Sequence, residues 1–223
     1  LFLLLPWAQV RDALLKLPPG TWAFVLVGFV AGHGVGVFKW RLFVNAGRAS
    51  LTTAVVDGWN PNPDLDVWGF GVVGANIFLA GDFSNIGGVS TVAVGKVNNT
   101  TGARVAWNAN VNGTVWSVEG SAGGTSVYVA GSFTTVNGGT ARRGVAELDA
   151  STATATTWDP GINGVAQHLS RSGSTLYAGG MFTSAGTATV RNRAAAFDLR
   201  TGELTGWDPN VANGTVMTVA GTG

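Results

Sequence analysis

A tryptophan-led motif returns four times along the chain at nearly equal spacing. Trp59, Trp107, Trp158 and Trp207 open the segments WNPNP, WNANV, WDPGI and WDPNV, and the intervals between them are 48, 51 and 49 residues. Repeat periods of about 20–50 residues are typical of solenoids, propellers and related arrays. The spacing therefore predicts a chain of similar units that pack in succession.

Two further features recur in register with these tryptophans. An aromatic pair with a spacing of five residues encloses a small, glycine-containing segment at Phe78/Phe83, Tyr128/Phe133 and Tyr177/Phe182. Nine residues before each following tryptophan stand Asn98, Asp149 and Asp198. Because independent features keep one register over three units, we expect each unit to fold in the same way.

Each unit has the pattern of short β-strands joined by tight turns. The β-rich runs GTVWSVEG, TSVYVAGSF, RRGVAELDAS and TATATTW are bounded by Gly, Asn or Ser. Four short strands in a unit of about 49 residues match one blade of a β-propeller, whereas a β-helix uses much shorter coils. The expected fold is all-β, a propeller-like array of four-stranded blades.

The register of the repeat sets the expected boundaries of the blades. They are 59–106, 107–157 and 158–206, with the start of a further blade at 207–223. Both ends of the chain look cut, so we expect an incomplete fragment of a longer array. Between three and four blades do not close a ring, and further blades or a partner chain are expected to cover the sheet edges.

The N-terminal quarter leaves two alternatives at each of its segments. Residues 1–20 fit a signal-peptide remnant or an amphipathic lead-in. Residues 21–58 fit a degenerate blade, because LFVNAG mirrors the later MFTSAG, or a membrane anchor, because the run from Trp22 to Phe38 is apolar. Membrane contact, if present, is expected through residues 21–40.

The order of these motifs resembles the delta-60 repeat family of bacterial β-propeller proteins. The shared pattern is Trp-Asx-Pro, a strand, Tyr-x-Gly-Gly-x-Phe, a turn, Arg, a small apolar stretch ending in Asp, then Thr-Gly before the next Trp. The third unit matches throughout, the second lacks Thr-Gly, and the first has GKVN in place of the apolar-Asp ending. The resemblance implies an exported or cell-surface propeller and carries over no catalytic residue.

Packing is the favoured role of the recurrent tryptophan, and an aromatic platform for sugars is the alternative. An aromatic side chain buries about 150–250 Å², so one in each blade would seal that blade against the next. The Asx residue after it and Pro61, Pro160 and Pro209 are expected to form a turn. A bulge at the Ala-Gly or Gly-Gly pair is expected to bring both aromatics of a pair to one face.

No constellation of residues predicts a catalytic or metal site. The two histidines, His33 and His168, are isolated and the chain has no cysteine, which disfavours a zinc site or a Ser-His-Asp triad. His168 is expected at a strand position that Val118 occupies in the second unit. Asp64 and Asp66 form a short acidic loop, but an Asp-x-Asp-x-Asp-Gly run for calcium is absent.

The remaining recurrent polar residues are expected to serve the fold. Arg142 and Arg191 stand in phase seven residues before Asp149 and Asp198, and an ion pair within the blade is favoured over an anion site. Asn-x-Thr triplets are expected to be tight turns rather than glycosylation sites, and they begin at Asn98, Asn99, Asn112 and Asn213.

Composition excludes some classes of partner. Charged residues make up 11% of the chain and the net charge is +1, so no long-range field favours nucleic acid. We expect a non-catalytic extracellular or cell-surface module, without a cofactor, that binds or scaffolds a protein or glycan ligand. The alternatives are a membrane-anchored accessory subunit of a larger complex and a polysaccharide-acting enzyme domain.

Overall fold

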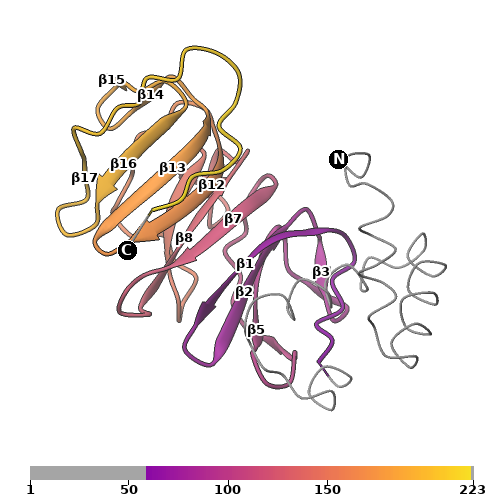
Figure 1. Ribbon diagram of the computed structural model, residues 1–223. Coiled ribbons are helices and arrows are strands. Elements are labelled where there is room, and N and C mark those ends of the chain that lie inside the picture. The colour runs from indigo at the N-terminus through magenta and orange to yellow at the C-terminus, as the bar shows by residue number, and fades with distance from the viewer. Residues whose placement is uncertain (1–58, 222–223) are drawn as a thin grey trace, which may run out of the picture. The chain divides into compact units, whose positions relative to one another are not determined.

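Three antiparallel sheets follow one another along the chain, one for each of the first three tryptophan-led units. The computed structural model describes residues 59–221, and Figure 1 shows their sheets in succession from purple to orange. The expectations for residues 1–20, 21–40 and 21–58 lie outside this range. Within it every regular element is a strand, and no helix there is long and apolar enough to cross a membrane.

Within each sheet the strands lie side by side in the order in which they occur in the chain; the first and third sheets have four strands and the second has three. The first sheet contains β1 (Val67–Val73), β2 (Asn76–Gly81), β5 (Val94–Asn98) and β6 (Arg104–Val105). The second contains β7 (Val115–Gly120), β8 (Ser126–Gly131) and β11 (Val145–Asp149). The third contains β12 (Val165–Ser172), β13 (Thr175–Met181), β16 (Ala194–Asp198) and β17 (Glu203–Leu204).

A small hairpin interrupts each sheet between its second and third strands, where the sequence predicts only a turn. Its strands are two residues long: β3 (Asn85–Ile86) with β4 (Val89–Ser90), β9 (Thr135–Val136) with β10 (Thr140–Ala141), and β14 (Ser184–Ala185) with β15 (Thr189–Val190). The inward residue of each hairpin, for example Ile86 or Val136, is fully buried. These hairpins therefore close the apolar interior at one end of each blade.

The second sheet departs from the expected four strands. A single bridge between Leu148 and Ala155 stands where the other sheets have their fourth strand. In the turn before that strand, Gly102 and Gly202 adopt left-handed φ values of 70° and 76°. Ala153 adopts the same conformation with φ 67°, although a Cβ disfavours it.

The first strands of successive sheets lie side by side, so that the sheets stack face to face. In the first pair, β7 comes so close that a side chain at Gly69 would meet the Trp116 carbonyl oxygen at 2.7 Å. In the second pair, the Ser117 hydroxyl accepts a hydrogen bond of 3.1 Å from the backbone N–H of Leu169. Sequential antiparallel sheets that stack through their first strands form the blades of a β-propeller, and the expected fold class is confirmed although the second sheet has only three strands.

The hydrophobic core consists of two clusters, one at each interface between sheets. The first joins Phe78 and Val94 to Val118 and Phe133, and the second joins Tyr128 to side chains of the third sheet. Tyr128 and Phe133 form one aromatic pair, yet they lie in different clusters. The prediction that both aromatics share a face is therefore wrong, and simple strand alternation over five residues explains the result.

Bulges do occur in each sheet, but in the first strand rather than at the glycine of the second. The register shifts at Val67/Gly69, Val115/Ser117 and Ala166/His168. Opposite each bulge, a side chain on glycine would collide with a carbonyl oxygen at or directly before the start of the first strand, at Gly81, Gly131 and Gly180. The small residues therefore permit close backbone approach, as expected, while the extra residue belongs to the partner strand.

Trp107, which is buried, and Trp158, which is half-buried, each connect two sheets. The Trp107 ring packs edge-on against the Phe78 ring of the preceding sheet, with the ring centroids 5.0 Å apart. Its indole N–H donates a 3.0 Å hydrogen bond to the Asp149 carbonyl of its own sheet. Trp158 likewise packs against Tyr128 at 5.6 Å and donates to the Gly202 carbonyl at 2.7 Å. The packing role of these tryptophans is confirmed.

Replacing Gly131 with alanine tests the close approach of the first two strands in a blade. We expect Gly131→Ala to lower the free energy of unfolding by about 1–3 kcal/mol, because the new methyl group would overlap the Thr114 carbonyl. Gly139→Ala is the matched control, since no atom lies within 4 Å of its Cβ position. Urea unfolding of both variants checks this, and equal stability would contradict the role of Gly131.

Candidate functional site

The residue after each tryptophan forms the turn that the sequence predicts. Its side-chain oxygen accepts a hydrogen bond from the backbone N–H two residues later, at 3.1 Å for Asn60, 3.0 Å for Asn108, 3.0 Å for Asp159 and 3.0 Å for Asp208. The donor residue has a left-handed φ in every case, at Asn62, Asn110, Gly161 and Asn210. The Trp-Asx-Pro motif is thus an Asx-turn, and its polar side chain serves the backbone.

The recurrent arginines form ion pairs, but with different partners from those suggested by their spacing. Arg142 lies 3.8 Å from Asp159, and Arg191 lies 3.6 Å from Asp208, each in the tryptophan motif of the following unit. Arg142 also donates to the carbonyls of Trp158 and Thr156 at 3.1 and 2.7 Å. These arginines therefore hold one unit to the entry of the next.

In the first unit, an arginine from another strand, Arg104, takes the place of the recurrent arginine. Thr91 takes the position of Arg142 and Arg191, because its backbone N–H makes the same bond to the start of the small hairpin. Its buried hydroxyl accepts a 2.7 Å hydrogen bond from Nε of Arg104 in β6. The first unit thus also has a guanidinium at this place, but Arg104 supplies it from a different position in the sequence.

The Asp64 carboxylate binds the small β3–β4 hairpin and is therefore not free to bind a metal ion. We call a side chain in this role a hairpin clamp. The carboxylate of Asp64 accepts hydrogen bonds from the backbone N–H groups of Ser84 and Asn85 at 2.8 and 3.0 Å. The Asn85 side-chain amide also donates to it, and this bond is the largest cause of a lowered pKa for Asp64. Asn112 and Asn163 bind the corresponding N–H groups in the next two units. Asp66 accepts a hydrogen bond from the Asp82 N–H through its backbone carbonyl at 3.2 Å.

The Asx residues at the end of the third strand cap a turn, as expected. Asn98, Asp149 and Asp198 each accept hydrogen bonds from backbone N–H groups two or three residues later. For Asp149 the Thr152 N–H is the main cause of a lowered pKa, and for Asp198 it is the Arg200 N–H. No group of three or more His, Cys, Asp and Glu side chains gathers within residues 59–221.

His168 lies in the bulge of β12 and is equivalent to Ser117, one residue before the predicted Val118. Its Nδ1 accepts a 3.5 Å contact from the backbone N–H of Val219, just as Ser117 receives Leu169 N–H. The side chain thus helps to hold the segment after Trp207 against the third sheet. His33 lies outside the described residues.

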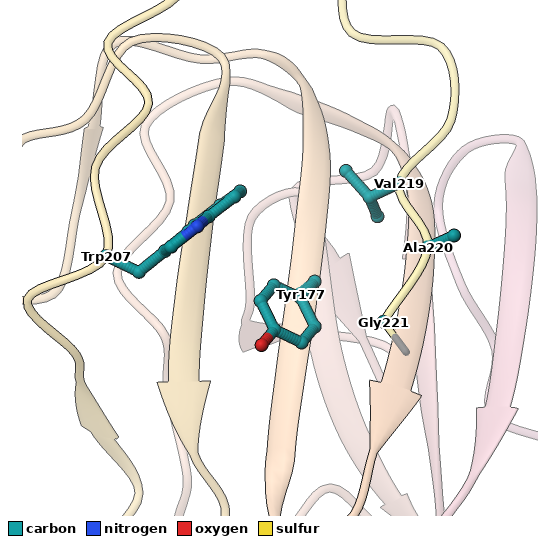
Figure 2. Close-up of a pocket in the computed structure, with 5 residues that line it drawn as sticks. All are labelled: Tyr177, Trp207, Val219, Ala220 and Gly221. Atoms are coloured by element: carbon teal, nitrogen blue, oxygen red, sulfur yellow. The ribbon is translucent and has the colours of Figure 1, made fainter. Parts of the chain in front are cut away.

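The tryptophan row contains one exposed member. Trp207 is 41% exposed, whereas Trp107 is 3% exposed. Figure 2 shows Trp207 with Tyr177 and the segment Val219–Gly221 around a surface pocket of about 320 Å³. The two rings meet edge-on at 5.3 Å. Trp158 packs against both Tyr128 and Phe197, with ring centroids 5.6 Å apart in each pair, so Trp207 is more open to a sugar than Trp107 or Trp158.

A second and larger pocket opens between the first two sheets; we call it the basic pocket. It has a volume of about 590 Å³ and two cationic side chains line it, Lys96 of β5 and Arg171 of β12. Its other polar lining residues include Asn76, Ser121 and Ser151, and none of the lining residues in the described part of the chain is Asp or Glu. The basic pocket is the candidate functional site because its charged residues are not repeated in the other units.

The sequence predicts neither cation of the basic pocket. Lys96 occupies the register position that Glu147 and Ala196 occupy in the next two sheets, where each faces the aromatic residue of the second strand. This departure from the repeat, within GKVN, is the signal that could have identified it. Arg171 comes from another sheet, so its approach depends on the stacking.

Changing Asp64 to asparagine tests the assignment of its carboxylate as a clamp. Because folding lowers the pKa of Asp64, its ionised form stabilises the fold above the unfolded pKa, and this contribution disappears as the pH falls through the folded pKa. We expect Asp64→Asn to fold and to lose less stability than the parent chain between pH 7 and pH about 3. Asp64→Ala should cost about 1 kcal/mol at pH 7, a typical loss for a cap. Urea unfolding across this pH range checks both, and an Asn variant with undiminished acid sensitivity would contradict the assignment.

The comparisons with known proteins include structural likenesses at low sequence identity. No family model matches the chain, and no curated protein matches it. The WD40 domain of Neurospora crassa Pan2 is similar with a TM-score of 0.41 and 14% identity, over 63% of this chain and 39% of that one. Kuenenia stuttgartiensis hydrazine synthase gives a TM-score of 0.37 and 14% identity, over 76% and 52%. These likenesses are weak, and the assignment of the fold rests on the chain's own sheets.

Proposed function

We propose that this chain is part of a non-catalytic β-propeller that binds or scaffolds a partner at the cell surface. The observation that supports it is that polar residues that recur in the units and polar residues that do not recur have different roles. Those that recur form Asx-turns, hairpin clamps and ion pairs between units. Two residues that do not recur, Lys96 and Arg171, line an open pocket. A scaffold of repeated contacts with variable residues at a surface site is typical of binding modules.

Membership of the delta-60 repeat family and an extracellular location are part of this proposal. The motif order Trp-Asx-Pro, Tyr-x-Gly-Gly-x-Phe and Asp-x-x-Thr-Gly in residues 158–206 supports the membership. The location follows from that resemblance, since the family consists of exported or cell-surface propellers. The membrane-anchored alternative depends on residues 21–40, and the enzymatic alternative would need acids that are not engaged in turns.

Protease treatment of intact cells that express the chain with an epitope tag tests the proposed location. We expect added protease to digest the tagged chain while a cytoplasmic marker protein stays intact. Release of the chain in salt or plain buffer would support a peripheral module, and release only in detergent would favour the anchored subunit. Protection of the chain until the cells are lysed would contradict the proposal, as would turnover in a polysaccharide hydrolysis screen.

A further inference from the structure

We propose that the basic pocket binds the carboxylate of an acidic sugar, with Lys96 and Arg171 as its two cationic contacts. This inference rests on the proposed binding function and names the class of ligand. A pocket of about 590 Å³ is within the range of about 300–1,000 Å³ that small-molecule sites occupy. The argument depends on the charges, the free polar groups and the contrast with the next interface.

The ammonium of Lys96 is held in place but keeps hydrogen-bonding capacity. It donates to the Ala150 carbonyl at 2.8 Å and lies 5.7 Å from the centroid of the Phe78 ring. An ammonium has three donors, and this is the single hydrogen bond of the Lys96 side chain within residues 59–221. The backbone carbonyl and the ring thus orient a cation that no ion pair among these residues neutralises.

Arg171 reaches the same pocket from the third sheet. Its Nε donates to the Gly120 carbonyl at 2.9 Å and its Nη1 to the Gly173 carbonyl at 3.0 Å. Nη2 has no partner in the part of the chain that the structure describes, and Arg171 forms no ion pair there. Two backbone carbonyls therefore fix the plane of a guanidinium, the group best suited to bind a carboxylate.

The neighbouring carboxylates are already engaged. Glu119 accepts a 3.1 Å hydrogen bond from Arg171 backbone N–H. Asp149, which lies close enough to Lys96 for the charges to interact, accepts the N–H groups of its own turn. These acids reduce the positive potential of the basic pocket, but they do not line it. An incoming carboxylate would therefore meet two cations and no competing acid at the wall.

The equivalent interface between the second and third sheets carries an acidic side chain at this position instead. Glu147 stands in the place of Lys96 and accepts hydrogen bonds from the Ser126 and Thr156 hydroxyls at 2.6 and 2.8 Å. Burial, followed by the charge of Glu147, raises the pKa of Tyr128 to about 12. A cation at the first interface is therefore not a requirement of the fold, since the same register position works with an acid.

The remaining polar groups favour a hydroxylated ligand. The Asn76 amide and the Ser151 hydroxyl line the basic pocket and make no side-chain hydrogen bond within residues 59–221. Amide and hydroxyl groups both donate and accept, which suits the ring hydroxyls of a sugar. A fatty or aromatic acid would require a more apolar wall. A uronic acid, which combines a carboxylate with ring hydroxyls, therefore fits best.

An NMR titration of the full 223-residue chain with glucuronate, with glucose as the neutral counterpart, tests the inference. We expect glucuronate to bind about tenfold more tightly than glucose, the effect of one charged hydrogen-bonding contact. Lys96→Gln and Arg171→Gln should each weaken glucuronate binding about tenfold. Gln at position 96 can still donate to the Ala150 carbonyl, so this variant keeps the test valid if Arg171→Gln does not fold.

Arg143→Gln is the matched control, because Arg143 is exposed and lies outside the basic pocket. It removes the same charge and should leave the affinity unchanged. Equal affinity for glucuronate and glucose, or an equal loss in Arg143→Gln, would overturn the inference. A tetraglutamate peptide that binds as tightly as glucuronate, with the same loss in Lys96→Gln, would overturn the choice of a sugar. If the chain lies on the cell surface but does not bind glucuronate, the pocket inference alone is refuted. If the chain lies inside the cell, the proposed function is refuted.

Discussion

The stack of blades depends on an indole that is bound on two sides. Its ring lies edge-on against the aromatic residue of the preceding sheet, and its N–H donates to a carbonyl of its own sheet, as at Trp107 and Trp158. Tryptophan is suited to this place because it has a large apolar surface and one donor that must be satisfied when buried. The contact therefore fixes both the spacing and the register of two sheets, and its recurrence accounts for the period of the sequence.

The other recurrent side chains solve local problems that this arrangement creates. The chain must turn sharply as it leaves one blade, and the Asx-turn after each tryptophan makes this turn. The small hairpin must be held against the first strand, and Asp64, Asn112 and Asn163 hold it. Because these residues are used by the fold, sequence variation at the interfaces is left to positions such as Lys96 and Glu147. The proposed ligand specificity arises at such a position.

Much of the fold is predictable from the sequence, because period and residue alternation are both directly visible in it. The tryptophan spacing predicts the sheets, and the Asx and glycine positions predict the turns. The position of the bulge is not visible, since either strand of a pair can carry the extra residue; the structure places it opposite Gly131 rather than at it. The partner of Arg142 was also missed, because spacing along the chain does not show that its side chain extends to Asp159 in the next tryptophan motif.

The basic pocket could not be predicted from the sequence either, because its two cations come from different sheets. Lys96 and Arg171 belong to different sheets, and they meet only through the close packing of first strands that the glycines and bulges allow. The unusual Lys96 marks a departure from the repeat, but its consequence depends on an arginine two units away. Repetition thus predicts what the blades share and gives little information on what distinguishes one interface from another.

A double-mutant cycle on Tyr128 and Trp158 tests the central contact most directly. The two rings meet edge-on at 5.6 Å across the second interface. If each tryptophan binds its sheet to the preceding one, replacing both residues with leucine should reveal a coupling free energy of about 0.5–1.5 kcal/mol in urea unfolding. Tyr128 paired with Trp107, which packs at the other interface, should show none. Strictly additive effects for Tyr128 and Trp158 would contradict the account.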